Sequence, residues 1–127
     1  IEVKKFLKKR NVEFAFLHCN RTYPAPFQDI NLSWINSLKK IHSLIGYSGH
    51  EYGLTTTFAA VSMGCTWIER HLTLDRAMWG SDHLASVEPQ GFIKLVKGIR
   101  TIEKAMGNGG PRVCLSGELS KRKSLRK

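Results

Sequence analysis

The chain alternates short apolar segments with stretches of helical periodicity, and this alternation restricts the fold more than any other feature. Three apolar segments have the length and composition of β-strands, at residues 13–19, 44–48 and 65–69. Apolar residues at helical spacing occupy residues 2–10, about 32–41, 53–63 and 89–106. Strands that alternate with helices pair in parallel through right-handed crossovers, so the sequence predicts an α/β fold.

Several local features refine this expectation. Residues 13–19 form an uninterrupted apolar run of the kind that is buried on both faces of a parallel sheet. Asp29 or Asn31 is a candidate N-cap for the second helix. Trp34 and Trp67 are interpreted as residues that pack between helices and sheet.

The number of strands leaves two α/β architectures open. An open doubly wound sheet normally has five or more strands, whereas only three are visible here. A (β/α)₈ barrel needs about 250 residues, so a chain of this length corresponds to roughly its last three-eighths. The composition alone does not choose between these folds.

The net charge of +10 suggests a nucleic-acid partner, but its distribution argues against one. Residues 1–10 carry a net charge of +4 and residues 112–127 one of +5, which leaves +1 for the segment between them. Both basic segments are interpreted as solvated surface, and no nucleic-acid-binding motif accompanies them. No apolar run approaches the roughly 20 residues of a transmembrane helix, so neither nucleic acid nor a membrane is an expected partner.

The cysteines indicate a reducing, cytoplasmic setting. Cys19, Cys65 and Cys114 are odd in number and form no CxxC pair, and no secretory signal precedes them. Because the first residue is Ile1 and not Met, we expect the sequence to begin inside a longer reading frame.

Polar residues gather just past the carboxyl end of each expected strand. They occupy residues 18–23, 47–51 and 69–71. Consecutive loops converge at the carboxyl edge of a parallel sheet, and ligands bind there in folds of this kind. The sequence therefore places its candidate site at this edge.

His50 and His71 follow neighbouring strands, so their imidazoles could converge on one divalent metal ion. Each histidine could instead simply hydrogen-bond its own loop. Glu69 shares a strand face with His71 because strand side chains alternate with period two. A ligand-binding or catalytic role for Glu69 competes with a simple ion pair to Arg70 or Arg76.

Four segments resemble, in order, the motifs of one enzyme family. Residues 18–26 read HCNRTYPAP, residues 46–50 read GYSGH, residues 69–76 read ERHLTLDR and residues 85–89 read ASVEP. These are similar to the HCxxxYPxP, GYSDH, E(K/R)HFTLDR and ASxEP motifs of the sialic acid synthases. That family of N-acetylneuraminate synthases includes the pseudaminic and legionaminic acid synthases, and the resemblance covers about residues 10–107.

The resemblance implies a partial TIM barrel, of which residues 1–110 supply about the last three βα units. It also implies a transferase that condenses phosphoenolpyruvate with an N-acetylmannosamine-type sugar to a nonulosonic acid and phosphate, using a divalent metal such as Mn²⁺, or Mg²⁺ or Co²⁺. His50 and His71 inherit the role of metal ligands. The resemblance further implies that the sugar or the reacting water is contacted by Tyr23, Glu69 and Asp82. The phosphoenolpyruvate side is contacted by Asn20, Arg21 and Ser48.

The chain departs from the family pattern at Gly49, where the motif has Asp, so we expect His50 to be held more loosely. Residues 111–127 resemble the start of a basic linker to an antifreeze-like (SAF) domain, which the sequence does not include. The resemblance implies a homodimer for the full-length protein, and we expect the 127 residues alone to be inactive and prone to associate. The alternative is a non-catalytic binding or regulatory domain of the same fold.

Overall fold

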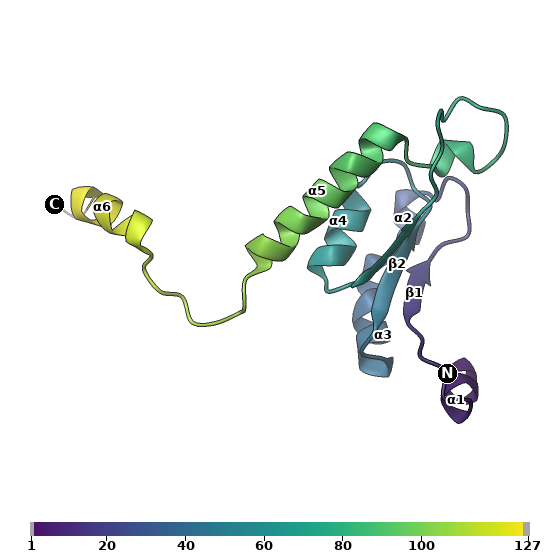
Figure 1. Ribbon diagram of the computed structural model, residues 1–127, viewed down its shortest axis with the longest axis horizontal. Helices are drawn as coiled ribbons and strands as arrows, with labels where there is room; N and C mark the ends of the chain where they lie inside the picture. Colours follow the sequence, from purple (N-terminus) through teal and green to yellow (C-terminus); the bar gives the residue numbers. More distant parts are fainter. Residues whose placement is uncertain (1, 126–127) are drawn as a thin grey trace.

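A computed structural model describes residues 2–125 of the chain (Figure 1). Helices and strands alternate through most of it, as the periodicity predicts. In chain order the elements are α1 (Glu2–Lys9), β1 (Phe16–Cys19), α2 (Phe27–Ile30), the 3₁₀ turn η1 (Leu32–Trp34), α3 (Ile35–Ile41), β2 (Ile45–Gly49), α4 (Thr55–Ser62), β3 (Trp67–Arg70), the 3₁₀ turn η2 (His83–Ala85), α5 (Pro89–Met106) and α6 (Ser116–Leu125).

The three strands form one parallel sheet in the order β1-β2-β3. Its register aligns Cys19 with Ser48 and Ser48 with Glu69, so one cross-strand row runs through all three strands. The outer edges of β1 and β3 have no strand partner within the part of the chain that the structure describes. The predicted α/β class with parallel strands is confirmed.

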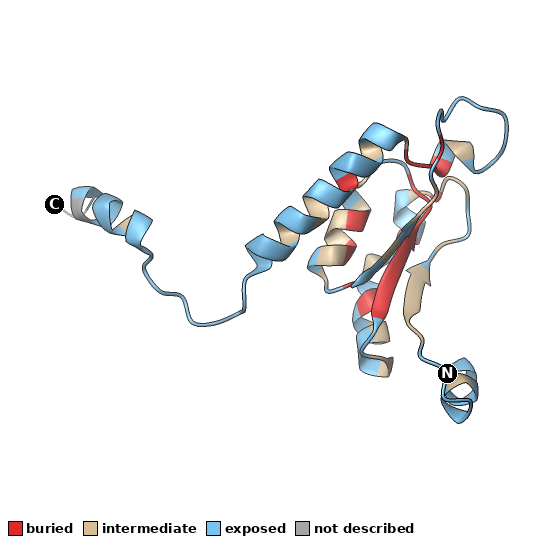
Figure 2. Cartoon of the chain, in the orientation of Figure 1, coloured by how far each residue is buried: buried red, intermediate tan, exposed pale blue. Residues whose placement is uncertain are grey.

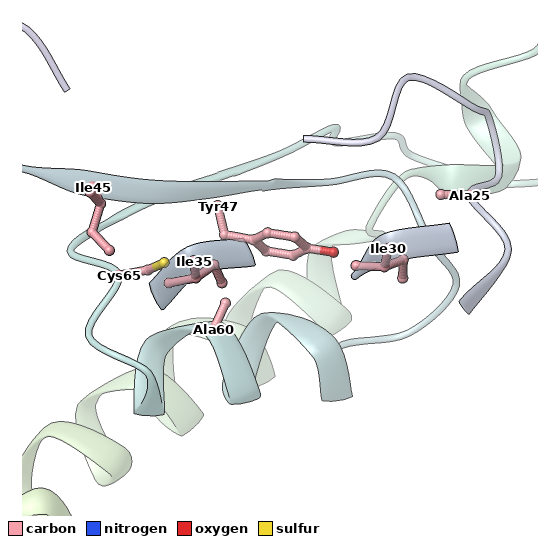
Figure 3. Packing of buried hydrophobic residues seen from close by; sticks show 7 residues of the cluster. All are labelled: Ala25, Ile30, Ile35, Ile45, Tyr47, Ala60 and Cys65. Atoms are coloured by element: carbon pink, nitrogen blue, oxygen red, sulfur yellow. The ribbon is translucent and has the colours of Figure 1, made fainter. Parts of the chain in front are cut away.

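Helices cover one face of this sheet and build the hydrophobic core against it (Figure 2). Ile45 and Tyr47 of β2 point toward this side and are each only 1% exposed. They pack with residues of the helices and loops in a cluster shown in Figure 3, which comprises Ala25, Ile30, Ile35, Ile45, Tyr47, Ala60 and Cys65. Because strand side chains alternate, every second residue of β2 contributes to this core.

The opposite face of the sheet, which we call the open face, is covered by no helix of residues 2–125. Two cross-strand rows lie on it: Leu17, Gly46 and Trp67 form one, and Cys19, Ser48 and Glu69 form the other. A Cβ atom on Gly46 would lie 2.6 Å from the Cβ of Trp67 and would also meet its carbonyl oxygen. Only glycine allows β2 and β3 to approach this closely.

Three local expectations were wrong. Residues 13–19 are not buried on both faces, because within residues 2–125 β1 is an edge strand and nothing covers its open face. Asn31 ends α2 in a left-handed conformation (φ 48°), and no N-cap side-chain hydrogen bond precedes η1 or α3. Trp34 and Trp67 are 51% and 56% exposed, because Trp67 lies on the open face and Trp34 at the molecular surface.

Beyond Met106 the chain leaves the folded body. An extended segment leads to α6, which lies apart from the sheet and its helices (Figure 1). This helix falls within the segment that was expected to be a basic linker. No helix within residues 2–125 has both the length and the hydrophobicity to cross a lipid bilayer.

Candidate functional site

The carboxyl ends of the three strands bring five of the expected site residues together on the open face. Ser48 and Glu69 come from the strands themselves, His50 and His71 from the first positions after β2 and β3, and Tyr23 from the loop after β1. The ring centroids of His50 and His71 are 5.2 Å apart, and that of Tyr23 is 4.3 Å from His50 and 5.5 Å from His71. The predicted convergence of the two histidines at this edge is confirmed.

His50 is buried and held in one orientation by the loop after β1. Its Nδ1 donates a hydrogen bond of 2.7 Å to the backbone carbonyl of Asn20, and its own carbonyl accepts one from the Ala25 amide. Because a carbonyl can only accept, the proton of a neutral imidazole lies on Nδ1 and the lone pair on Nε2. That Nε2 atom lies 3.3 Å from the Tyr23 hydroxyl and 3.5 Å from Ser48 Oγ.

Glu69 is oriented by a direct contact across the sheet. The Ser48 hydroxyl donates a hydrogen bond of 2.6 Å to Glu69 Oε1, as the register predicts for side chains opposite one another. Neither of the ion pairs considered for Glu69 forms, since Arg70 pairs with Glu51 and Arg76 with Glu88. Glu69 is exposed, so its second oxygen is available to a ligand or to water.

The two histidines are candidate ligands for a divalent metal ion. Metal-bound imidazoles usually donate the other ring N–H to a carbonyl or carboxylate, and His50 makes this contact to Asn20. His71 is half-buried beside His50. Within residues 2–125 no group of three or more His, Cys, Asp or Glu side chains is arranged to hold a metal, so the remaining ligands would come from water, substrate or other parts of the protein.

The other expected site residues lie in loops around this cluster. Asn20 uses its side chain within its own loop, where Oδ1 accepts from the Thr22 amide and Nδ2 donates to the Asp29 carbonyl. Arg21 is exposed. Asp82 immediately precedes η2 and accepts a hydrogen bond from the Ser81 hydroxyl, so its described contacts stay within its own loop. The ligand-binding roles of these three residues remain predictions.

A buried ion pair that the sequence reasoning missed lies next to the site, on the helix-covered face. Arg70 Nη1 is 3.0 Å from Glu51 Oε1, and the two side chains are 1% and 0% exposed. Tyr47 donates a hydrogen bond of 2.7 Å to Glu51 Oε2. Burial and this neighbouring carboxylate raise the pKa of Tyr47 well above its usual range, so the phenol stays protonated. Only the strand alternation of Glu69, Arg70 and His71 hinted that Arg70 would face away from the open face.

His18 also belongs to the covered face, although it was grouped with the polar residues at the end of the first strand. Its Nε2 lies 2.6 Å from the carbonyl oxygen of Ile30, and its ring stacks near Tyr47. It therefore stabilises the connection between β1 and α2 and does not reach the site.

Comparisons with known proteins agree on one family. Residues 2–110 match the model of the NeuB family. The N,N'-diacetyllegionaminic acid synthase of Campylobacter jejuni is 47% identical over 107 residues, which are 84% of this chain and 31% of the relative. The N-acetylneuraminate-9-phosphate synthase of Homo sapiens is 42% identical over 109 residues, 84% of this chain and 30% of the relative.

A solved structure extends the agreement to three dimensions. The N-acetylneuraminic acid (sialic acid) synthetase from Leptospira borgpetersenii superposes with a TM-score of 0.84 at 34% identity, and the match covers 99% of this chain and 46% of that one. The chain thus spans about a third of the length of the curated relatives that it matches.

Proposed function

Because this chain belongs to the NeuB family, we propose that it is the part of a sialic acid synthase-like enzyme that carries the metal-binding end of the active site. The reaction is a condensation: carbon 3 of phosphoenolpyruvate bonds to the aldehyde carbon of an open-chain N-acetylated amino sugar, water adds at carbon 2, and phosphate leaves. The convergence of Tyr23, Ser48, His50, Glu69 and His71 at one strand edge is the observation that carries this proposal.

The chain supplies about the last three βα units of a TIM barrel, with residues 1–110 in the barrel and residues 111–127 leading toward an antifreeze-like domain. Two observations support this arrangement. The open face carries Trp67 and Glu69 exposed, as expected for barrel-interior residues whose facing strands lie elsewhere in the protein. An apolar groove beside β3 is lined by Val61, Ile68, Ile99, Ile102 and Met106, which further barrel units would cover.

His50 and His71 hold a divalent ion, with Mn²⁺ proposed and Mg²⁺ or Co²⁺ as substitutes. Held there, such an ion would supply Lewis-acid polarisation of the aldehyde oxygen of the sugar. His50 binds through Nε2, because Nδ1 is engaged with the Asn20 carbonyl. Tyr23 lies against both rings, where its hydroxyl reaches the sugar oxygen that gains charge during the reaction.

Glu69 acts as the acid–base group. Its carboxylate takes the proton from the water that adds at carbon 2, and the Ser48 hydroxyl fixes its orientation while lying on the phosphoenolpyruvate side. Asn20 and Arg21 extend that side, where an arginine suits a phosphate. Asp82, from the loop that follows β3, contacts the sugar.

The full-length enzyme acts as a homodimer in the cytoplasm. The dimer is proposed from the family resemblance, and the compartment from the three unpaired cysteines, Cys19, Cys65 and Cys114. The proposed acceptor is an N-acetylmannosamine-type sugar.

Phosphate release by the full-length protein, with phosphoenolpyruvate, an N-acetylmannosamine-type sugar and Mn²⁺, tests the proposal directly. We expect phosphate to appear only when both substrates and the metal are present, and His50→Ala to abolish both Mn²⁺ binding and turnover. An unaltered rate in His50→Ala would contradict the assignment. A protein that binds Mn²⁺ but consumes no phosphoenolpyruvate with any acceptor of this class would instead be a non-catalytic binding or regulatory domain.

A further inference from the structure

Glu51 and Arg70 form the centre of a buried polar cluster directly behind the site. Arg70 donates to the Thr57 hydroxyl at 2.9 Å and to the carbonyls of Gly53 and Glu51 at 2.9 and 2.8 Å. Glu51 accepts hydrogen bonds from Tyr47 and Thr56 in addition to its ion pair. A cluster with this many directed contacts fixes the positions of both backbone segments that meet in it.

Those backbone segments carry the two histidines. His50 immediately precedes Glu51 in the chain, and His71 immediately follows Arg70. Side chains of neighbouring residues on extended backbone point to opposite faces, so the ion pair joins the two segments from the covered side while the imidazoles meet on the open side. The distance between the imidazoles therefore depends on how the Glu51–Arg70 pair holds β2 and β3 together past their last ladder partners, Gly49 and Arg70.

The Glu51 carboxylate also fills the space beside Gly49. A Cβ atom on Gly49 would lie 3.0 Å from Glu51 Oε2, 3.0 Å from Arg70 Cδ and 2.8 Å from Tyr47 Cε1. Glu51, two residues further along the chain, therefore occupies the space that a side chain at position 49 would enter. The expectation that Gly49 loosens His50 concerns a missing carboxylate beside the imidazole and stays a prediction; the contact that the structure shows for His50 Nδ1 is to the Asn20 carbonyl.

We infer that Glu51 and Arg70 are positioning residues, which set the separation and the ring orientation of His50 and His71. This inference rests on the proposed function, since it concerns how the proposed metal ligands are placed. Both side chains lie on the covered side of the sheet, whereas the imidazoles meet on the open side. One donor of the cluster, Arg70 Nε, is buried and has no hydrogen-bond partner within residues 2–125.

The test uses the full-length protein with Arg70→Lys and Glu51→Gln, each of which preserves most of the side-chain volume. Arg70→Lys keeps the charge but loses the planar fork that reaches several acceptors at once. Matched controls are Arg100→Lys and Glu103→Gln, the same substitutions in an exposed ion pair on α5 with a distance of 2.9 Å. Circular dichroism and thermal unfolding first establish the temperature at which every variant is folded.

Two readouts separate positioning from general stability. Calorimetric titration with Mn²⁺ should give about tenfold weaker binding in both cluster variants, the usual scale for groups that orient a metal ligand. Nitrogen NMR of histidine-labelled, metal-free protein should show His50 as a single Nδ1–H tautomer in the wild type and as a mixture in the variants. The control variants should match the wild type in both measurements.

Folded cluster variants with wild-type Mn²⁺ affinity and a single His50 tautomer would overturn the inference, as would controls that weaken binding equally. If both cluster variants fail to fold, Thr57→Val removes one Arg70 contact, and unchanged affinity and tautomer there would also overturn it. A wild type that binds no Mn²⁺ defeats the proposed function, while the tautomer measurement still decides the positioning role.

Discussion

The two faces of the small sheet contain the same three strands but have opposite environments. On the covered face, Ile45 and Tyr47 are each 1% exposed and pack against the helices. On the open face, the neighbouring positions hold Ser48 and Glu69, joined by a hydrogen bond, with Trp67 56% exposed in the row below. Successive residues of one strand therefore contribute in turn to the hydrophobic core and to the site. A substitution at a core position should lower stability, whereas one at the adjacent site position should lower activity.

The largest expected effect is on the open face. Glu69→Gln keeps the shape of the side chain but removes its ability to take a proton, so we expect turnover to fall by about 10²–10⁴-fold in the full-length enzyme. The melting temperature should stay the same, because Glu69 is exposed and its partner Ser48 can donate equally well to an amide oxygen. Phosphate-release kinetics and thermal unfolding measure the two quantities. A variant that loses stability while keeping its rate would reverse the roles of the two faces.

On the covered face the effect should be on stability. Ile35 is fully buried in the core cluster, so Ile35→Ala should cost about 2–5 kcal/mol in the free energy of unfolding. The same substitution at Ile93 on α5, which is 46% exposed, is the control and should cost within about 0.5 kcal/mol. Urea unfolding of the 127-residue chain gives both values. Equal costs at the two positions would show that the core does not form as described.

A smaller effect concerns alkaline pH. Burial raises the pKa of Cys65 from an ordinary value near 9 to about 11. The folded chain thus keeps the thiol proton at a pH where the unfolded chain has lost it. The stabilisation is complete below about pH 9 and disappears as the pH rises toward 11. Urea midpoints between pH 8 and 10 should therefore fall less steeply in Cys65→Ala than in the wild type. Parallel slopes would contradict the burial of this thiol.

The smallest effect is spectroscopic and tests whether the open face becomes a barrel interior. With Trp34, Trp79 and every tryptophan outside these 127 residues replaced by Phe, Trp67 alone reports on this face. In the 127-residue chain its emission should lie close to that of the urea-unfolded protein, because the indole is 56% exposed. In the full-length protein the emission should shift to shorter wavelength. Identical emission from the two would mean that no further strands cover this face.

Local patterns predicted a large part of this molecule. Helix α5 runs from Pro89 to Met106, as its periodicity and flanking residues indicate, and the polar residues after the strands do meet at one edge. These features depend on residues close in sequence or on the general geometry of parallel sheets. The burial of β1 could not be predicted, since it depends on whether another strand covers its outer edge.

The Glu51–Arg70 pair could not be predicted for a related reason. The two residues are 19 positions apart, and each stands among polar residues that look like parts of a binding loop. Their pairing follows from the register that places Gly49 opposite Arg70, which no local pattern reveals. Trp67 was misread because an apolar residue in a strand can face either side, and the pattern alone did not say which side the helices cover.

Gly46 links the packing of the strands to the spacing of the histidines. It lies opposite Trp67, four residues before His50, just as Trp67 lies four residues before His71. One methyl group at this position would have to push β2 and β3 apart, because it would meet the backbone of Trp67 as well as its side chain. A larger residue at position 46 would therefore separate β2 and β3 where Gly46 faces Trp67. We expect this separation to increase the distance between the His50 and His71 imidazoles, although position 46 itself lies outside the site.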